Sequence, residues 1–99
     1  MSDFRVRNMT LKIDKQSSGD ELVVRLIGNL GVEHLAEVTA EVRLEGRRVV
    51  IDVSEVTLIS IEGIRLLNAC EDDGIAVINA SPYILEWLAL ERRVDPPRS

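Results

Sequence analysis

One stretch in the middle of the chain constrains its fold more than any other. Residues 48–53 contain the β-branched run Val49-Val50-Ile51, which is the pattern of a strand that is buried on both faces. A short loop follows, and Ser60 then leads through a Ser-x-x-Gly turn into an apolar helix predicted over residues 61–71. A buried strand that runs directly into an amphipathic helix is the basic unit of an α/β domain.

Strand and helix patterns alternate along the rest of the chain. Residues 10–15 and 21–28 read as two strands, and the turn cluster at 16–20 between them predicts an antiparallel hairpin. A further strand is predicted over 75–79, and Ser81-Pro82 is a strong helix start, because serine caps free N–H groups and proline loses no needed donor there. The order is β-β-α-β-α-β-α, which predicts right-handed crossovers and a mixed, mostly parallel β-sheet with packed helices in one α/β domain.

Each predicted helix carries an apolar stripe that we expect to face the sheet. The first helix starts at Val32 and is closed by Leu44-Glu45-Gly46, since glycine commonly follows a helix C-cap. The apolar positions recur at steps of three and four, as the core-facing side of a helix requires. The three stripes are Leu35, Val38 and Val42; Ile64, Leu67 and Cys70, widened by Ile61, Leu66 and Ala69; and Ile84, Leu85 and Leu88.

Length and composition fit one domain with an aliphatic core. The 99 residues suit a single domain, and we place it at residues 9–92, with a flexible leader at 1–8 and a flexible tail at 93–99. Hydrophobic residues make up 45% of the chain, but only three are aromatic, so the core must be built from Val, Ile, Leu and Ala.

Charge and cysteine content exclude several classes of protein. The net charge of -5 argues against a nucleic-acid binder, which needs clustered Lys and Arg. Cys70 is the single cysteine, so no internal disulfide can form and a reducing compartment fits. No apolar run approaches the roughly 20 residues of a membrane-spanning helix, and the N-terminus lacks a signal-peptide core, so we expect a cytoplasmic protein without direct membrane insertion.

No motif in the chain points to catalysis, a cofactor or a metal. Gly-rich phosphate loops, Cys-x-x-Cys, His-Glu-x-x-His and Gly-x-Ser-x-Gly are all missing from the sequence, which favours a protein that is not an enzyme. His34 has no obvious metal partners and is read as a surface histidine. Cys70 is read as a buried, unreactive thiol, and Glu71-Asp72-Asp73 as a solvated turn rather than a calcium loop.

Residues 52–67 carry a resemblance to a known family. They read Asp-Val-Ser-Glu-Val-Thr-Leu-Ile-Ser-Ile-Glu-Gly-Ile-Arg-Leu-Leu. This resembles the signature of the STAS family, the domain of sulphate transporters and anti-sigma factor antagonists, whose pattern is roughly Asp-Leu-Ser-x-Val-x-x-Ile-Asp-Ser-x-Gly-Leu. The order of elements over nearly all of residues 10–92 also matches that family. The resemblance implies a STAS-like single domain, in which Asp52 and Ser54 fix the loop by local hydrogen bonding.

The chain departs from the STAS pattern at the family's phosphorylation site. Ser60 stands where the family has its second aspartate, and Ile61 stands where it has the phosphorylatable serine. Ser60 is read as a helix N-cap, and a phosphoacceptor shifted by one residue is the alternative. Ile61 either offers an apolar contact to a partner or packs into the core beside Ile64. We read Glu62 as a favourable acid at a helix N-terminus and Gly63 as a site of close packing against the sheet.

The resemblance implies a regulatory function with a protein partner. Small bacterial members of the family are anti-sigma factor antagonists that bind an anti-sigma factor kinase, and in this chain Leu58, Ile59, Ser60, Ile61 and Glu62 would form that surface. The first alternative is a small regulatory subunit of an ABC-type lipid transporter. The second is a sensor that binds a small anion or nucleotide at the start of the helix.

Two aromatic residues on the last helix raise a separate possibility. Tyr83 and Trp87 are four residues apart, so they could form an exposed patch for a protein partner, or Trp87 could cover the edge of the core. Together with an open edge strand, this pair is compatible with a homodimer.

Overall fold

The first two strands form the predicted antiparallel hairpin. β1 (Leu11–Ser18) pairs with β2 (Glu21–Leu30) without interruption, from Leu11 opposite Gly28 to Ser18 opposite Glu21. Gly19 has a φ of +65° at the first position of the two-residue turn, which is where such turns favour glycine. Residues 16–18, predicted as turn, therefore belong to β1, because the two residues Gly19-Asp20 are enough to reverse the chain.

The parallel part of the sheet follows on one side of this hairpin. In the computed structural model, which describes residues 11–43 and 48–94, the strand order is β1-β2-β3-β4, and β3 (Arg48–Ile59) and β4 (Ala76–Ile78) run parallel to β2. The predicted leader at 1–8, the helix end at 44–46 and the tail at 95–99 lie outside the described residues. Arg93 and Val94, which were predicted to open the tail, lie in the last helix.

β3 is twice as long as predicted. The sequence places its end at residue 53, because Ser54, Glu55 and Thr57 read as loop, but the strand continues to Ile59. It stays paired with β2 as far as Leu30 opposite Ile59. The register of this pairing shifts twice, between Arg25 and Ile27 and between Gly28 and Asn29 of β2. Polar side chains in this half of β3 face solvent, which is why they do not interrupt the strand.

β4 is an edge strand and not the core strand that was predicted over 75–79. It is three residues long, and all three pair with β3, from Ala76 opposite Val50 to Ile78 opposite Asp52. Ala76 and Ile78 are exposed and Val77 is half-buried, because only the side of β4 that carries Val77 faces the helices. Its position at the edge of the sheet explains this low burial.

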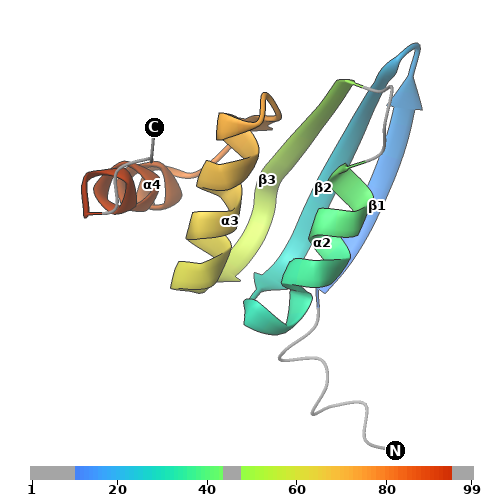
Figure 1. Cartoon of the computed structure of the whole chain (residues 1–99). Helices are drawn as coiled ribbons and strands as arrows, with labels where there is room; N and C mark the ends of the chain where they lie inside the picture. Colours follow the sequence, from blue (N-terminus) through green and yellow to red (C-terminus); the bar gives the residue numbers. More distant parts are fainter. Residues whose placement is uncertain (1–10, 44–47, 95–99) are drawn as a thin grey trace, which may run out of the picture.

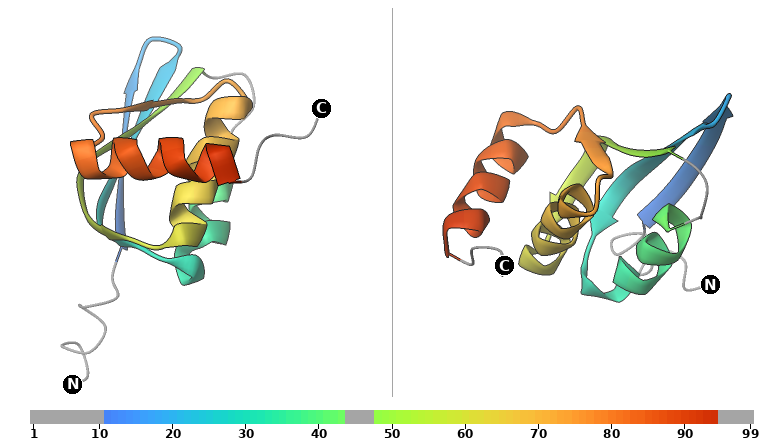
Figure 2. Two further views of the ribbon diagram at one scale, coloured as in Figure 1. Left: turned by 90° about the vertical axis from the view of Figure 1, so that its left-hand side faces the viewer. Right: turned by 45° about the horizontal axis from the view of Figure 1, so that its top comes forward.

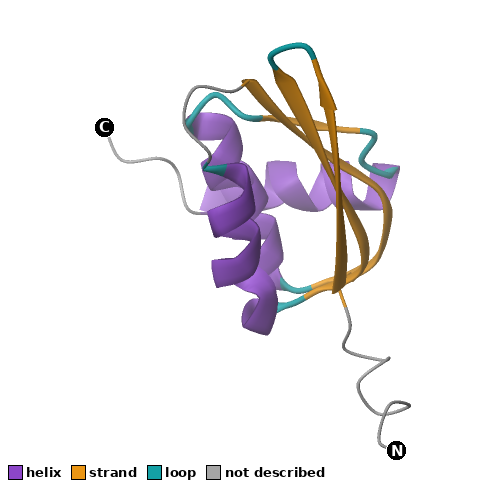
Figure 3. Ribbon diagram, turned by 90° about the vertical axis from the view of Figure 1, so that its right-hand side faces the viewer, coloured by secondary structure: helices purple, strands orange, loops and turns teal. Residues whose placement is uncertain are grey.

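The first two α-helices cover one face of the sheet, while the opposite face carries no helix formed by residues 11–43 and 48–94 (Figures 1 and 3). Lys15 and Glu41, 2.7 Å apart, bridge β1 and the first α-helix across that covered face. The last helix lies against α3, at the end of the molecule away from β1 (Figure 2). The elements are a 3-10 turn, η1 (Val32–His34), followed by α2 (Leu35–Val42), α3 (Ile61–Asp72) and α4 (Pro82–Val94).

The core is aliphatic, as predicted, and most of the expected stripes face it. Val38 and Val42 of α2 and Ile84 and Leu88 of α4 are buried, while Leu35 is half-buried. The α3 stripe of Ile64, Leu67 and Cys70 is completely buried. Leu66 packs against the core from its edge, but Ala69 and Leu85, also expected to face inward, are exposed.

Leu85 was misplaced because α4 packs on another helix and not directly on the sheet. Ile84, Leu88 and Glu91 recur at steps of four and three and form the side of α4 that faces α3. Leu85 lies about 100° around the helix from Ile84, and its side chain is 56% exposed. The start of α4 is as predicted, since Ser81 Oγ accepts a hydrogen bond from the Ile84 N–H at 3.3 Å.

Candidate functional site

The candidate site lies where β2 and β3 end side by side (Figure 1, at the foot of the sheet). β2 ends at Leu30 and the chain continues into η1, while β3 ends at Ile59 and the chain continues into α3. The Ser60 N–H donates a hydrogen bond to the Leu30 carbonyl at 3.0 Å. This bond ties the two connections together, so the starts of η1 and α3 form one edge of the molecule.

Ser60 is the N-cap of α3, as predicted. Its Oγ accepts a hydrogen bond from the Gly63 N–H at 3.2 Å, and its carbonyl accepts one from the Ile64 N–H at 3.0 Å. The hydroxyl therefore satisfies one of the free N–H groups that every helix start presents. The alternative in which Ser60 also accepts phosphate stays a prediction.

Gly63 allows the first turn of α3 to lie directly against the ends of both strands. A Cβ at this position would stand 2.9 Å from Ile59 Cγ1, 3.0 Å from the Leu30 carbonyl oxygen and 3.1 Å from Leu30 Cγ. Because one of these atoms is main chain, the clash could not be relieved by turning a side chain. The prediction that Gly63 has a packing role is confirmed.

Three apolar side chains are exposed at this edge, and we call Val32, Leu58 and Ile61 the apolar rim. Their exposed fractions are 58%, 62% and 36%, respectively. Ile61 therefore does not pack into the core beside Ile64, which was one of the two readings. Exposed apolar groups gathered on one edge are typical of a surface that binds another macromolecule.

The five residues predicted to contact a partner are not equally available. Leu58, Ile61 and Glu62 are exposed and Ser60 is half-buried, but Ile59 is only 9% exposed and belongs to the core. Successive side chains of a strand point to opposite faces, so Ile59 must turn inward when Leu58 turns outward. The Ile59 side chain is therefore part of the core, and a contact between this residue and a partner stays a prediction.

Val32 was not predicted as part of this edge. It was read as the first residue of a regular helix, but residues 32–34 form a 3-10 turn before α2 begins. His34, predicted to be a surface histidine, is half-buried, and its Nδ1 accepts a hydrogen bond from the Gly31 N–H at 3.1 Å. A histidine three residues after Gly31, the glycine that follows β2, was the available signal for this turn.

Asp52, in the first half of β3, joins this strand to β2 and to Asn79, the residue that follows β4. Its Oδ1 accepts a hydrogen bond from the Ser54 N–H at 2.9 Å, as predicted, and its Oδ2 lies 3.6 Å from Arg25 Nε. Burial raises the pKa of the Asp52 carboxyl, but hydrogen bonds from Ser54 and Asn79 and the charge of Arg25 outweigh it, so its pKa is lowered overall. The contacts lie within β3, across to β2 and to Asn79 after β4, and not in a loop directly after β3 as expected.

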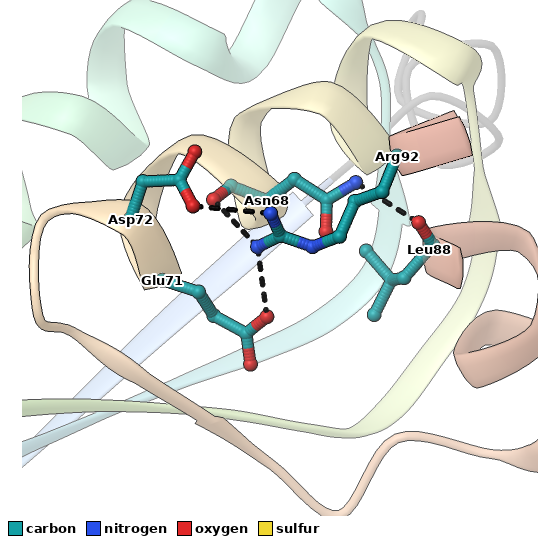
Figure 4. A network of polar contacts seen from close by, with 5 residues as sticks. All are labelled: Asn68, Glu71, Asp72, Leu88 and Arg92. Atoms are coloured by element: carbon teal, nitrogen blue, oxygen red, sulfur yellow. Dashed lines mark hydrogen bonds and ion pairs between the residues drawn. The ribbon is translucent and has the colours of Figure 1, made fainter. Parts of the chain in front are cut away.

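The contact between α3 and α4 is a separate polar cluster (Figure 4). Asn68 Nδ2 donates to the Leu88 carbonyl at 3.1 Å, and the Arg92 guanidinium reaches Asp72 at 3.0 Å and Glu71 at 3.4 Å. Nearby, Arg65 Nε lies 2.7 Å from the buried Glu91 carboxylate. These bonds hold α4 in place together with the buried Ile84 and Leu88.

The two aromatic residues of α4 differ in burial, so each fits one of the two roles that were considered. The rings of Tyr83 and Trp87 have their centroids 5.8 Å apart at a tilt of 52°. Trp87 is half-buried and packs against the core, whereas Tyr83 is 64% exposed. Trp87 therefore covers the edge of the core, and Tyr83 adds an exposed ring beside it.

Residues that could support chemistry are few in the described part of the chain. Cys70 is completely buried, and burial raises the pKa of its thiol more than the charge of Arg43 lowers it, so it is the unreactive thiol that was predicted. Within residues 11–43 and 48–94, no three His, Cys, Asp or Glu side chains are grouped as metal ligands. No helix within these residues is long and apolar enough to cross a membrane.

Two solved structures share this architecture. An anti-sigma factor antagonist from Rhodobacter sphaeroides, a STAS domain, aligns with a TM-score of 0.58 and 22% sequence identity over 73% of this chain and 89% of that one. The anti-sigma factor antagonist SpoIIAA in its unphosphorylated form aligns with a TM-score of 0.60 and 14% identity over 82% and 83%. No protein-family model matches the sequence, and no curated protein matches it significantly.

Proposed function

Because the chain has the STAS fold, we propose that it is a non-catalytic regulatory module that binds a protein partner through the apolar rim. The kind of role is that of an anti-sigma factor antagonist, and the partner is an anti-sigma factor kinase. Unlike the phosphorylation-controlled members of the STAS family, this module lacks a serine at the usual position. Its binding is then governed by the amount of each protein or by the state of the partner.

The observation that carries this proposal is the exposure of Ile61 at the first position of α3. The family pattern has its phosphorylatable serine there, and an isoleucine that is 36% exposed can neither accept phosphate nor gain from contact with water. Val32 and Leu58, near the ends of β2 and β3, are also exposed apolar side chains. Burying these side chains against a partner is favourable, at roughly 25 cal/mol for each Å² of apolar surface removed from water.

The polar groups around the rim support binding without catalysis. The Ser60 hydroxyl already caps α3, and Glu62 places an acid at the first turn, where negative charge is favourable. We propose that Glu62 contributes a charged contact at the border of the interface. Such border charges affect the rate of association and the choice of partner more than affinity.

The sensor alternative is weakened by what surrounds the start of α3. A small anion would need free N–H groups and a cation, but the Gly63 N–H is bonded to Ser60 Oγ. Arg65, the nearest cation in sequence, is paired with Glu91 at 2.7 Å. The transporter-subunit alternative uses the same apolar rim, and the identity of the bound protein separates it from the proposal.

The proposal is tested by affinity capture from the organism's own lysate, with bound proteins identified by mass spectrometry. The wild-type chain should capture an anti-sigma factor, and Leu58→Asp should lose it. The matched control is Leu90→Asp, which alters a leucine of similar exposure on α4 and should still bind. Capture of an ATPase and a permease would establish the transporter alternative, and equal capture by both variants would exclude the rim.

The missing phosphorylation switch has its own test. The captured kinase is incubated with this protein and ATP, and the intact mass of the protein is measured. We expect no mass increase. A stoichiometric gain of one phosphate that disappears in Ser60→Ala would move the switch to Ser60 and contradict the proposal.

A further inference from the structure

β1 presents the longest open backbone edge in the described part of the chain. It stands first in the order β1-β2-β3-β4, and all eight of its residues pair with β2 on one side. Its other side pairs with no described segment, whereas β4, at the opposite edge, is only three residues long (Figure 1). An open edge of this length is a template for another strand.

The regular pairing of β1 with β2 determines which backbone groups point outward. In a two-residue turn, the flanking residues Ser18 and Glu21 turn their backbone groups toward each other. Antiparallel pairing alternates from there, so every second residue bonds to β2 and the residues between them turn away. The outward N–H and C=O groups are therefore those of the odd-numbered residues, which include Leu11, Ile13 and Lys15.

These outward groups restrict how β1 could pair with a second copy of itself. In an antiparallel pair, an outward residue must stand opposite an outward residue. This places the two-fold axis at a residue, so registers centred on any residue from Lys12 to Ser17 pair at least three residues of each strand. Those centred on Gln16 and Ser17 bring no opposite charges together. A centre at Lys12, Asp14 or Lys15 places a like-charged pair at the axis, and like charges directly opposite each other are destabilising.

The register centred on Ile13 is the one that matches opposite charges. It sets Ile13 against its symmetry mate, and it sets Lys12 of each copy against Asp14 of the other. Both charged side chains are exposed and lie on the face without helices, and neither has a salt bridge within residues 11–43 and 48–94. Leu11 and Ile13 are half-buried at the margin of the core, so a second strand would complete their burial.

We propose that the β1 edge is an interface for a second copy of this chain, with β1 pairing antiparallel to β1 and Ile13 on the two-fold axis. The two sheets then join into one continuous sheet. Edge strands that avoid pairing carry charges that repel a copy of themselves, but the charges of β1 complement each other about Ile13. This inference concerns β1 and does not depend on the function proposed for the apolar rim.

Charge exchange at two exposed positions tests this register in solution. Sedimentation velocity of the full chain over a concentration series should show a monomer–dimer equilibrium. Lys12→Glu and Asp14→Lys each create two repulsive pairs, so each should raise the dimer dissociation constant at least about tenfold. The double variant Lys12→Glu/Asp14→Lys restores opposite charges and should recover dimerisation, which 1 M salt should weaken.

Several results would overturn the proposal. A wild-type chain that stays monomeric up to about 1 mM, single variants that dimerise like the wild type, or a double variant that stays monomeric would each do so. Tyr83→Ala is the control for the exposed aromatic ring of α4 and should leave the equilibrium unchanged. Loss of the dimer in Tyr83→Ala would place the interface on α4 and overturn the assignment to β1.

Cross-linking gives a second, independent measurement. In the proposed dimer the two Ile13 residues face each other at about 5.5 Å between Cα atoms, within the range of a disulfide. Ile13→Cys should therefore form a covalent dimer under mild oxidation. Gln16→Cys is the matched control, because its two copies would stand about 20 Å apart. Equal cross-linking of both variants, or none with Ile13→Cys, would contradict the register.

Discussion

Two regions of α3, its first turn and its contact with α4, are held by different kinds of interaction. At the start of α3, main-chain groups carry the contact: the Ser60 N–H bonds to the Leu30 carbonyl, and Gly63 lets the helix lie against both strands. At the α3–α4 contact, long side chains carry it, through Arg65 with Glu91 and the bonds of Arg92.

This difference explains where a binding surface can be placed. Because main-chain groups and one glycine hold the first turn of α3, Leu58 and Ile61 are not needed for its position and can be exposed to a partner. The side chains that hold α4 are needed for the position of that helix, so they are less available to a partner. We therefore expect substitutions on the apolar rim to affect binding more than folding, and substitutions in the α3–α4 cluster to do the opposite.

The largest effect should come from placing a side chain where the helix meets the strands. Gly63→Val would force atoms within about 3 Å of the Leu30 carbonyl and the Ile59 side chain. Overpacking of this kind costs about 3 kcal/mol in the free energy of unfolding, measured by urea denaturation. Ala69→Val, at an exposed position of the same helix, is the control and should cost less than about 1 kcal/mol. Similar midpoints for both variants would contradict the close packing.

A second prediction concerns the unequal burial of the Arg65–Glu91 pair. Arg65 is 53% exposed but Glu91 is 8% exposed, so Arg65→Ala leaves a buried carboxylate without its partner. We expect a loss of about 2 kcal/mol. Glu91→Gln leaves an arginine that water can solvate and should lose about 1 kcal/mol or less. If Glu91→Gln proves the more harmful in urea denaturation, the side chains do not hold α4 in the way described.

Changing the N-cap residue of α3 should have a moderate effect on the free energy of unfolding. This effect should depend on whether residue 60 carries a hydrogen-bond acceptor and not on the size of its side chain. Ser60→Ala removes the acceptor of the Gly63 N–H and should lower the free energy of unfolding by about 1 kcal/mol. Ser60→Asp keeps an acceptor and adds negative charge at the helix start, so its stability should be close to that of the wild type. Thermal melts of the three proteins compare them, and equal losses in both variants would show that the cap is unimportant.

The smallest effect should be a change in the acid dependence of stability. The pKa of Asp52 is lower in the folded protein than its unfolded value near 3.8, so its ionised form favours folding. That contribution is complete above the unfolded pKa and is lost as the pH falls through the folded pKa. Asp52→Asn should therefore be less stable at pH 7 but should lose less stability between about pH 5 and pH 2. Parallel curves for the two proteins, measured by urea denaturation, would contradict this role.

Much of the start of α3 could be predicted from the sequence because its determinants are local. Ser60 caps a helix whose first turn follows directly, and Gly63 is costly in a helix unless close packing requires it. The buried stripe of Ile64, Leu67 and Cys70 follows from helical periodicity alone. Each of these predictions depends on residues within a few positions of one another.

The predictions were wrong where contacts with a segment that is distant in the sequence determine the structure. Residues 54–59 read as loop, but they stay in β3 because β2 continues beside them as far as Leu30. Leu85 read as core, but α4 packs on α3 and leaves it exposed. The Arg65–Glu91 and Arg92 contacts join residues 20 or more positions apart, and no local pattern indicates them.

The sequence by itself determined the order of strands and helices, the aliphatic core, the capped start of α3 and the apolar residue at the phosphorylation position of the STAS pattern. These properties follow from periodicity, capping and residue type, which act over short distances along the chain. Only the tertiary structure decided that Val32, Leu58 and Ile61 are all exposed near the ends of β2 and β3, that Ile59 is buried, and that β1 stands at the edge of the sheet formed by the described strands. Those properties depend on which strands become neighbours, and that choice is made by the packing of the whole domain.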